Sequence, residues 1–211
     1  MMPNKEPYVI GLTGGIASGK SEVTNYLKSQ GYTVLDADQA YHQAMKKGGP
    51  AYQALLDHFG QKILSKEGEI DRKNLSDLVF REPQKRRELD QLTHPIIFQV
   101  FMEKYHSLPP ETFKDGLVFF DIPLLFEMGS LRDQLKINSV WLVAASEKTQ
   151  LARLEKRNGF SKEEALTRIR AQMPLEKKEQ LADKILYNEK DLKALYQEIE
   201  EVLREERGTY A

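Results

Sequence analysis

The stretch Gly14-Gly15-Ile16-Ala17-Ser18-Gly19-Lys20-Ser21 restricts the possible folds of this chain more than any other feature. It matches the pattern G-x-x-x-x-G-K-[ST], in which backbone N–H groups and a lysine hold a polyphosphate. An apolar run, Tyr8 to Leu12, precedes it, and a segment that reads as a helix, Glu22 to Lys28, follows it. A strand that turns through glycines into a helix N-terminus points N–H donors and the helix dipole at one place. We therefore predict a phosphate-binding loop rather than a chance match in a glycine-rich turn.

The loop also predicts the cofactors. Lys20 supplies a mobile positive charge for the β- and γ-phosphates of ATP, and the Ser21 hydroxyl is a suitable ligand for Mg²⁺. The predicted ATP-binding residues of this segment are Gly14, Gly15, Ile16, Ala17, Ser18, Gly19, Lys20, Ser21 and Glu22.

The composition narrows the remaining possibilities. With 211 residues, 40% hydrophobic and 30% charged, the chain is long enough for one globular domain with insertions. The formal net charge of -1 gives no overall attraction to nucleic acid or to an anionic membrane. The chain has no cysteine, which excludes disulfides, thiolate metal sites and a cysteine nucleophile. No apolar run has the length of a membrane span or a signal peptide, so we expect a cytoplasmic protein that binds neither nucleic acid nor membrane.

Four further runs read as strands. They are Thr33 to Asp36, Leu117 to Asp121, Ser139 to Val143 and the weaker Lys184 to Tyr187. Helical segments separate them, which favours an α/β fold with a five-stranded parallel sheet wound on both faces. A phosphate loop after the first strand and a charged helical segment late in the chain indicate the nucleotide-kinase group of the P-loop nucleoside-triphosphate hydrolase class.

We expect one domain over residues 8–211, with two additions to the sheet. Residues 51–108 predict a helical, acceptor-binding insertion without strands, and residues 147–178 predict a helical lid. Within the insertion we expect helices over 51–59 and 72–80, with Asp71 as the N-cap of the second. A longer helix should run from Pro83 towards Tyr105, interrupted or restarted at His94-Pro95. A final amphipathic helix should run from Asp191 to about Arg204.

Several separate runs carry a resemblance to a known family. They are Gly11 to Ile16, Asp36-Ala37-Asp38, His94-Pro95, Asp121-Ile122-Pro123-Leu124-Leu125-Phe126-Glu127 and Arg168-Ile169-Arg170-Ala171-Gln172-Met173. In this order, from about Val9 to Asn188, the chain resembles dephospho-coenzyme A kinases. The resemblance implies phosphoryl transfer from ATP to the ribose 3′-hydroxyl of dephospho-CoA, the last step of coenzyme A synthesis. The partner is then a small-molecule substrate.

The chain departs from the family pattern at three positions. Ala17 stands where the family often has glycine, Glu22 replaces a common hydroxyl residue, and His42 stands where members often carry arginine. Alanine is small enough for the loop to keep its shape, and Ser21 still serves as the metal ligand. If the family's arginine holds the substrate, His42 must do so more weakly or another cation must take over.

The acceptor side has several candidate residues. Asp38 either takes the proton of the attacking hydroxyl or caps the following helix, and the resemblance favours the catalytic role. Asp121 ends a buried strand, where it can hold metal-bound water or contact the acceptor. Leu125 and Phe126 either line an apolar part of the pocket or pack in the core. The remaining acceptor-binding candidates are His94, which the resemblance raises above an ordinary surface histidine, and Glu127, which fits a ribose hydroxyl or plain solvation.

The predicted lid contains two arginines, Arg153 and Arg157, on one helical face. A cation that closes over the transferring phosphoryl group would offset its charge and exclude water, and we favour Arg157 for this catalytic role and Arg153 for ATP binding. Because many glutamates are interspersed in this segment, it equally fits a solvated helix whose arginines only form ordinary ion pairs. Asn188, after the fifth strand, either contacts the adenine or forms a turn.

Two other functions share parts of this pattern. A nucleoside or nucleotide kinase would use the same loop and sheet. A GTP-dependent switch would need an Asn-Lys-x-Asp guanine reader and an Asp-x-x-Gly after the third strand. The runs Asn188-Glu189-Lys190-Asp191 and Asp121-Ile122-Pro123-Leu124 do not match them.

Overall fold

The structure of the chain is a computed structural model that describes residues 6–210, with the side chains at positions 80, 81 and 83 outside the description. The chain forms two compact units. We call them the sheet unit, which comprises the described residues up to Leu35 and from Pro109 onward, and the helical unit, Asp36–Leu108.

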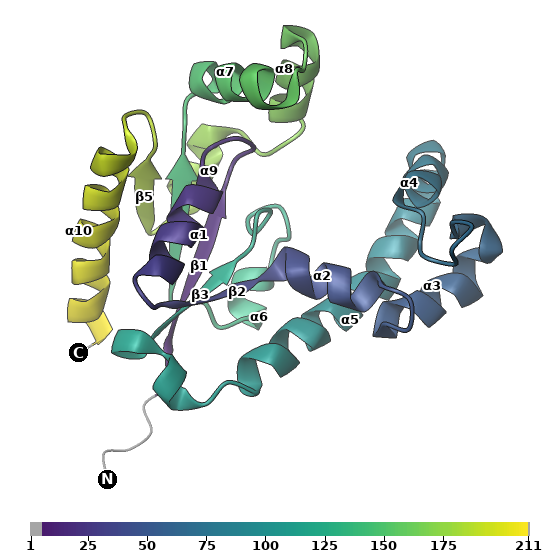
Figure 1. The fold of residues 1–211 in the computed structure, drawn as a ribbon, viewed down its shortest axis with the longest axis horizontal. Helices are drawn as coiled ribbons and strands as arrows, with labels where there is room; N and C mark the ends of the chain where they lie inside the picture. Colours follow the sequence, from purple (N-terminus) through teal and green to yellow (C-terminus); the bar gives the residue numbers. More distant parts are fainter. Residues whose placement is uncertain (1–5, 211) are drawn as a thin grey trace. The chain divides into compact units, whose positions relative to one another are not determined.

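The predicted parallel sheet is confirmed. Its strands are β1 (Tyr8–Gly14), β2 (Thr33–Asp36), β3 (Leu117–Asp121), β4 (Ser139–Ala144) and β5 (Lys184–Tyr187). They lie in the order β2-β3-β1-β4-β5, with β1 between β3 and β4 in parallel register (Figure 1). Leu12 is opposite both Asp121 and Trp141, so the phosphate loop, the end of β3 and the end of β4 share one edge. Ligands of such sheets bind at the carboxyl ends of the strands.

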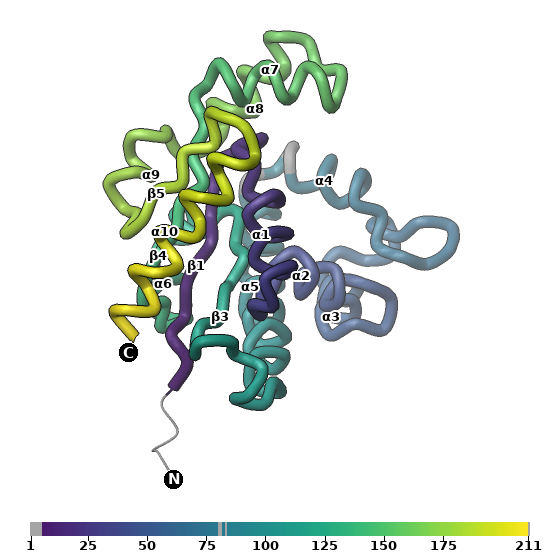
Figure 2. Tube along the Cα trace, turned by 60° about the vertical axis from the view of Figure 1, so that its left-hand side comes forward, coloured from purple at the N-terminus to yellow at the C-terminus, as the bar shows by residue number. Residues whose placement is uncertain are grey.

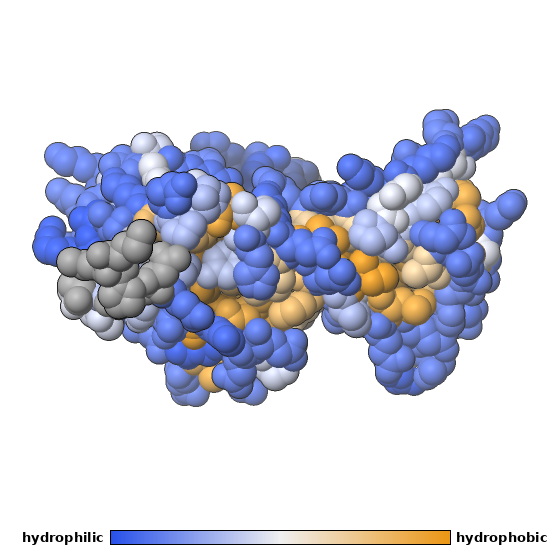
Figure 3. Space-filling model, turned by 90° about the horizontal axis from the view of Figure 1, so that it is seen from below, coloured by the Kyte–Doolittle hydropathy of each residue, from blue (hydrophilic) through white to orange (hydrophobic). Residues whose placement is uncertain are grey.

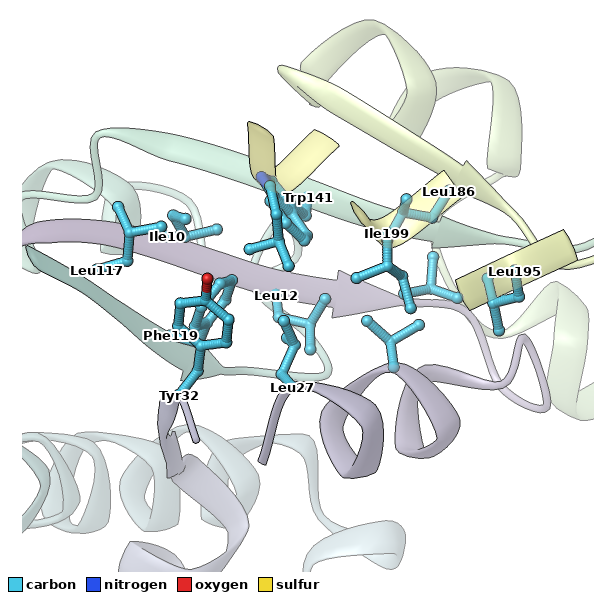
Figure 4. Close-up of a cluster of buried hydrophobic side chains, with 13 residues drawn as sticks. Ile10, Leu12, Leu27, Tyr32, Leu117, Phe119, Trp141, Leu186, Leu195 and Ile199 are labelled. Carbon is cyan, nitrogen blue, oxygen red and sulfur yellow. The ribbon is translucent and has the colours of Figure 1, made fainter. Parts of the chain in front are cut away.

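Side chains of one sheet face form the main core. Ile10 and Leu12 of β1 point with Phe119 and Trp141 towards α1 (Lys20–Ser29) and α10 (Leu192–Tyr210) (Figure 4). The helices contribute Val23, Leu27, Leu195, Ile199 and Leu203, all nearly inaccessible to solvent. At about 1.5–3 kcal/mol for each fully buried large apolar side chain, this cluster is a principal source of stability.

The alternate side chains of the strands face the opposite way and are covered too. A Cβ at Gly11 would lie 2.9 Å from Leu125 and 3.1 Å from Ile137, which flank the short helix α6 (Leu131–Gln134). Helix α9 (Leu175–Leu181) packs against β4. Because both faces are covered, the strands are apolar runs rather than alternating ones.

Helix α10 runs to Tyr210, so the predicted end at about Arg204 was wrong. Glu206 is only 2% exposed, accepts a hydrogen bond from Trp141 Nε1 at 2.9 Å, and also accepts one from the Ser139 hydroxyl. Tyr210 packs against Tyr8, and its hydroxyl donates to the Glu6 carbonyl at 3.1 Å. Hydrogen bonds to the buried Glu206 therefore stabilise this last part of the helix. The spacing of apolar residues cannot predict such polar contacts.

The segment expected as a helical lid forms three helices. Helices α7 (Glu147–Asn158) and α8 (Lys162–Arg170) pack together beyond the carboxyl ends of β1 and β4, as Figures 1 and 2 both show, and α9 follows. Gly159, at φ 67°, ends α7, and Ser161 with Glu164 forms a capping box for α8.

The helical unit contains α2 (Ala37–Met45), α3 (Pro50–Phe59), α4 (Arg72–Arg81) and α5 (Pro83–His106). Asp71 accepts hydrogen bonds from Lys73 N and Asn74 N, which confirms it as the N-cap of α4. The unit has its own apolar core, built by buried side chains of α2, α3, α4 and the turn after α3, with partly buried side chains of α5 packed against it. A short 3₁₀ turn occupies Gln61–Ile63 in this unit, and two more, Pro110–Thr112 and Lys114–Gly116, lie in the sheet unit.

Helix α5 continues through Pro95, so the predicted interruption there was wrong. A proline removes one backbone donor, but a helix of 24 residues keeps most of its other hydrogen bonds and its packing. Thr93 is 3% exposed, and its hydroxyl donates to the Leu89 carbonyl at 2.8 Å, four residues earlier. Helix α5 also packs on α2, α3 and α4, and these contacts outweigh the local effect of the proline.

The face in Figure 3 is mostly hydrophilic, with hydrophobic patches on either unit. A search of the described residues finds no helix with the length and apolarity needed to cross a membrane.

Candidate active site

The phosphate loop leads from β1 into α1 through glycines that leave no room for side chains. A Cβ at Gly14 would lie 2.7 Å from the Ser18 hydroxyl and 2.8 Å from the Val143 carbonyl. Gly19, the N-cap of α1, has φ 95°, and a Cβ there would lie 2.0 Å from Asn188 Nδ2. Only glycine fits such a close approach at positive φ. Ser18 is buried, and its hydroxyl oxygen has no hydrogen-bond partner among the described residues.

Ala17 adopts a left-handed backbone conformation, with φ 56°. This conformation is strained for a residue with a Cβ and comfortable for glycine. The loop therefore holds alanine at this position with a backbone strain that glycine would not have.

Lys20 forms an ion pair with Asp121, the last residue of β3. Asp121 is only 4% exposed, and its second oxygen accepts a hydrogen bond from the Thr24 hydroxyl of α1 at 2.7 Å. Both oxygens of the strand-end carboxylate are thus used within the sheet unit. The structure brings these two predicted residues together and adds Thr24, which the sequence analysis missed. Ser21 and Glu22, next along α1, are exposed.

Arg153 of α7 forms hydrogen bonds with backbone carbonyls of the phosphate loop. Its Nη1 donates to the carbonyls of Ala17 at 3.1 Å and Ser18 at 3.0 Å, and its Nη2 donates to the Asn188 carbonyl at 2.8 Å. The Asn188 side chain, in a residue that is 4% exposed, donates to the Ser18 carbonyl at 2.8 Å. Both predicted ATP-binding side chains therefore contact the loop's backbone in this structure.

Two glutamines hold the residue in the middle of the loop. Gln150 Nε2 of α7 donates to the Ile16 carbonyl at 2.7 Å, and Gln172 Oε1 accepts from the Ile16 N–H at 2.8 Å. Neither glutamine is a predicted site residue. Gln172 lies inside the run that carried the family resemblance, so that run was the available signal; Gln150 lies in a charged helix with no comparable signal.

Glu189 fixes the start of α7 to the turn after β5. It accepts hydrogen bonds from the Thr149 hydroxyl at 2.6 Å and from the Ser146 backbone N–H. The Thr149 hydrogen bond is the largest cause that lowers the pKa of Glu189 below its ordinary value of 4.5. Glu189 is thus an ionised cap at neutral pH, and it follows Asn188 directly.

The loop after β3 is anchored at both ends. Its Pro123 carbonyl accepts a hydrogen bond from the Thr13 hydroxyl at 3.0 Å. Leu125 is 2% exposed and packs in the core, while Phe126 is half-buried. Glu127 Oε1 lies 2.8 Å from Lys178 Nζ and accepts from the Met173 N–H at 3.2 Å. Of the predicted acceptor residues in this loop, Phe126 and Glu127 keep accessible surface, and Leu125 keeps almost none.

Arg157 is exposed near the end of α7, and its Nε donates to the Asn158 side chain at 2.9 Å. The structure gives Arg153 and Arg157 different surroundings, although they are one helical turn apart. Two other arginines of this region have partners as well. Arg168 lies over the Phe160 ring, and Arg170 lies 3.7 Å from Glu147.

Asp38 lies in the helical unit, at the second position of α2. The N-cap of that helix is Asp36, whose side chain accepts from Asp38 N and Gln39 N. The alternative in which Asp38 caps the helix is therefore wrong, and its carboxylate is exposed. One turn later, His42 Nδ1 contacts the Arg72 guanidinium. His94, in α5, is exposed and lies 3.7 Å from Asp90.

Comparisons with known proteins agree with this geometry. The family model for dephospho-CoA kinase matches residues 8–194. The dephospho-CoA kinase of Streptococcus mutans is 42% identical over 196 residues, which is 93% of this chain and 96% of the relative. The crystal structure of TT1252 from Thermus thermophilus aligns with a TM-score of 0.81 and 37% identity, over 95% of this chain and 98% of that one. The dephospho-CoA kinase structure from Campylobacter jejuni gives a TM-score of 0.69 and 28% identity, over 96% and 98%. This chain, built on the P-loop kinase fold, therefore belongs to the dephospho-CoA kinase family.

Proposed function

We propose that this chain transfers the γ-phosphoryl group of ATP to the ribose 3′-hydroxyl of dephospho-CoA, giving coenzyme A and ADP, and that it does so in the cytoplasm. The observation that carries the proposal is the ion pair between Lys20 and Asp121. It links the phosphate loop to the first residue of the Asp-Ile-Pro-Leu-Leu-Phe-Glu run, in a chain of the dephospho-CoA kinase family.

One bond forms and one breaks at the γ-phosphorus, and the 3′-hydroxyl gives up its proton to a base. The acceptor 3′-oxygen bonds to the γ-phosphorus, the bond from that phosphorus to the β–γ bridging oxygen breaks, and ADP leaves with the bond's electron pair. Such transfer depends on positioning and charge neutralisation. The N–H groups at the start of α1 and the Lys20 ammonium supply both for the donor phosphates.

The residues present fit a magnesium ion that is held mainly by ATP oxygens and water. Ser21 is exposed at the start of α1, and Asp121 lies at the same edge of the sheet. Among the described residues no three acidic or histidine side chains gather into a metal cluster. A site of few protein ligands is usual for Mg²⁺ bound with a nucleotide, where it neutralises phosphate charge. Ser21 would bind the ion directly, and Asp121 would orient its water.

Asp38 is our candidate for the group that takes the proton of the 3′-hydroxyl. It follows the carboxyl end of β2, its carboxylate is exposed, and the capping role at this helix belongs to Asp36. An exposed carboxylate that has no hydrogen-bond partner among the described residues is available to orient a substrate hydroxyl.

Arg157 is our candidate for a cation that closes over the phosphoryl group. Its guanidinium is exposed, whereas Arg153 is used by the loop carbonyls. His94, Phe126 and Glu127 remain proposed acceptor-binding residues.

The test is an assay of ADP release with ATP and Mg²⁺, using dephospho-CoA in one series and a panel of nucleosides and nucleotides in another. We expect turnover with dephospho-CoA, coenzyme A as the product, and loss of activity with a chelator that added Mg²⁺ restores. Dephospho-CoA that lacks the 3′-hydroxyl should not react. ADP release only with the nucleoside and nucleotide panel would refute the proposal and favour a nucleoside or nucleotide kinase.

A further inference from the structure

Helix α9 contains two lysines, of which Lys177 is exposed and Lys178 is buried. The Lys178 side chain is only 2% exposed. Its ammonium makes one ion pair, with Glu127 Oε1 at 2.8 Å, and has no hydrogen-bond partner among the described residues. Burying an ammonium costs several kcal/mol unless a carboxylate compensates it. Glu127 therefore supplies the opposite charge beside the buried Lys178 side chain, and Lys178 in turn fixes Glu127.

The contacts of Glu127 are one-sided. Its Oε1 receives both the Lys178 ammonium and the Met173 N–H. Its Oε2 has no hydrogen-bond partner among the described residues, and 23% of the side chain stays accessible. Oε1 is thus fixed by contacts within the protein, while Oε2 remains available for a donor outside the chain, such as a hydroxyl.

The segment that holds Glu127 is itself attached to the phosphate loop. Met173, whose N–H binds Glu127, follows Gln172, whose side chain binds the Ile16 N–H. Pro174 comes next and stiffens the chain before α9 begins at Leu175. Residues 172–178 therefore connect the loop that binds the donor with the carboxylate after β3.

We propose that Lys178 is a positioning residue: it fixes Glu127 so that the free carboxylate oxygen binds a ribose hydroxyl of the acceptor. This inference rests on the proposed function, because it assigns Glu127 to the acceptor. Lys178 does not touch the substrate itself. The connection through Gln172 keeps the Glu127 carboxylate in fixed register with the phosphate loop, and such register is what phosphoryl transfer requires.

The test measures the dissociation constants of dephospho-CoA and of ATP separately, by calorimetry, beside the melting temperature. We expect Lys178→Met to weaken dephospho-CoA binding by about tenfold to hundredfold, the range for a misplaced binding group, and to leave ATP binding within about twofold. The matched control is Lys177→Met, which removes the same charge from an exposed position of α9 and should change neither constant.

Coupling to Glu127 separates positioning from general damage. In a Glu127→Gln background, Lys178→Met should have little further effect on dephospho-CoA binding, because the group on which it acts has already changed. An effect that persists undiminished in this background would overturn the proposal. So would unchanged dephospho-CoA binding in a folded Lys178→Met protein.

A second variant covers the case in which Lys178→Met does not fold. Lys178→Met combined with Glu127→Leu replaces the pair by apolar side chains, an exchange that often keeps or raises stability. We expect a melting temperature near that of the wild type with dephospho-CoA binding still weakened. Recovery of both would show that the ion pair is only structural. If the wild-type protein itself does not bind dephospho-CoA, the proposed function fails instead, and this outcome is distinct from the others.

Discussion

At the scale of single residues, the phosphate loop contains two kinds of special position. Its glycines leave no room for a side chain, and its alanine, Ala17, has a strained backbone conformation. The left-handed φ of Ala17 is a local property of one residue, and it should be measurable as stability. By contrast, Ala171 at the end of α8 has φ -73°, where alanine is favoured over glycine.

Ala17→Gly should raise the free energy of unfolding by up to about 1 kcal/mol, because removal of the strain exceeds the added entropy of the unfolded chain. Urea unfolding followed by the fluorescence of Trp141, the one tryptophan of the sequence, measures the change. Ala171→Gly is the matched control and should lower stability by roughly 0.5–1 kcal/mol. Equal losses in the two variants would contradict the assignment of strain to Ala17.

Asp38 gives the residue-scale prediction for chemistry. Asp38→Asn should reduce kcat by about 10²-fold or more, the usual contribution of a general base, and leave ATP affinity nearly unchanged. Steady-state kinetics and ATP titration check both. Asp77→Asn, at an exposed acid of α4, is the control and should behave as the wild type. A fall in ATP affinity alone would assign Asp38 to the donor site.

At the scale of elements, α7 is joined to the phosphate loop by Gln150 and Arg153 and to the turn after β5 by Glu189. The pKa of Glu189 is lowered in the folded protein, so its contribution to stability is fully present above the ordinary value of 4.5. That contribution is lost as the pH falls through the lowered, folded-state value, where the carboxylate becomes protonated.

Glu189→Gln should therefore lower the melting temperature at pH 7, with a cost of about 0.5–1 kcal/mol as for other helix caps. The difference from the wild type should shrink as the pH falls below 4.5, since the wild-type carboxylate then loses its charge too. Thermal unfolding by circular dichroism over a pH series measures it. Glu163→Gln, at an exposed acid in the first turn of α8, serves as control. A difference that stays constant with pH would argue against an ionised cap.

The elements also show which features a sequence can predict. The apolar runs and the glycine pattern predicted all five strands and the loop, because burial on both sheet faces and positive φ leave local signs in the chain. Arg153 was predicted as a ligand-binding cation, but it binds carbonyls of residues 17, 18 and 188. Backbone carbonyls carry no sequence signature, so a contact of this kind cannot be derived from residue types. The continuity of α5 through Pro95 likewise depends on packing rather than on local preference.

At the scale of the whole molecule, the sheet unit and the helical unit have separate cores. The sheet unit contains the loop, Asp121 and Glu127, and the helical unit contains Asp38 and His94. The insertion predicted from the sequence begins at residue 51, whereas the helical unit of the structure begins at Asp36, where β2 gives way to α2.

The sheet unit should depend strongly on its last helix. Glu206→Leu leaves the Trp141 and Ser139 donors buried without an acceptor, which should cost on the order of 2–4 kcal/mol of unfolding free energy. Urea unfolding followed by Trp141 fluorescence reports it directly. The neighbouring Glu205→Gln removes only an exposed ion pair with Lys184 and should cost less than about 1 kcal/mol. Similar values for the two variants would mean that the buried network contributes little.

The position of Arg153 has an electrostatic consequence. Its guanidinium donates to three neutral carbonyls, and no carboxylate among the described residues forms an ion pair with it. Hydrogen bonds to carbonyls satisfy its N–H groups without cancelling its charge, and this charge is one of the causes that lower the pKa of the Glu189 carboxylate. Because the backbone of the loop already holds this guanidinium, its charge would need no rearrangement during the proposed phosphoryl transfer.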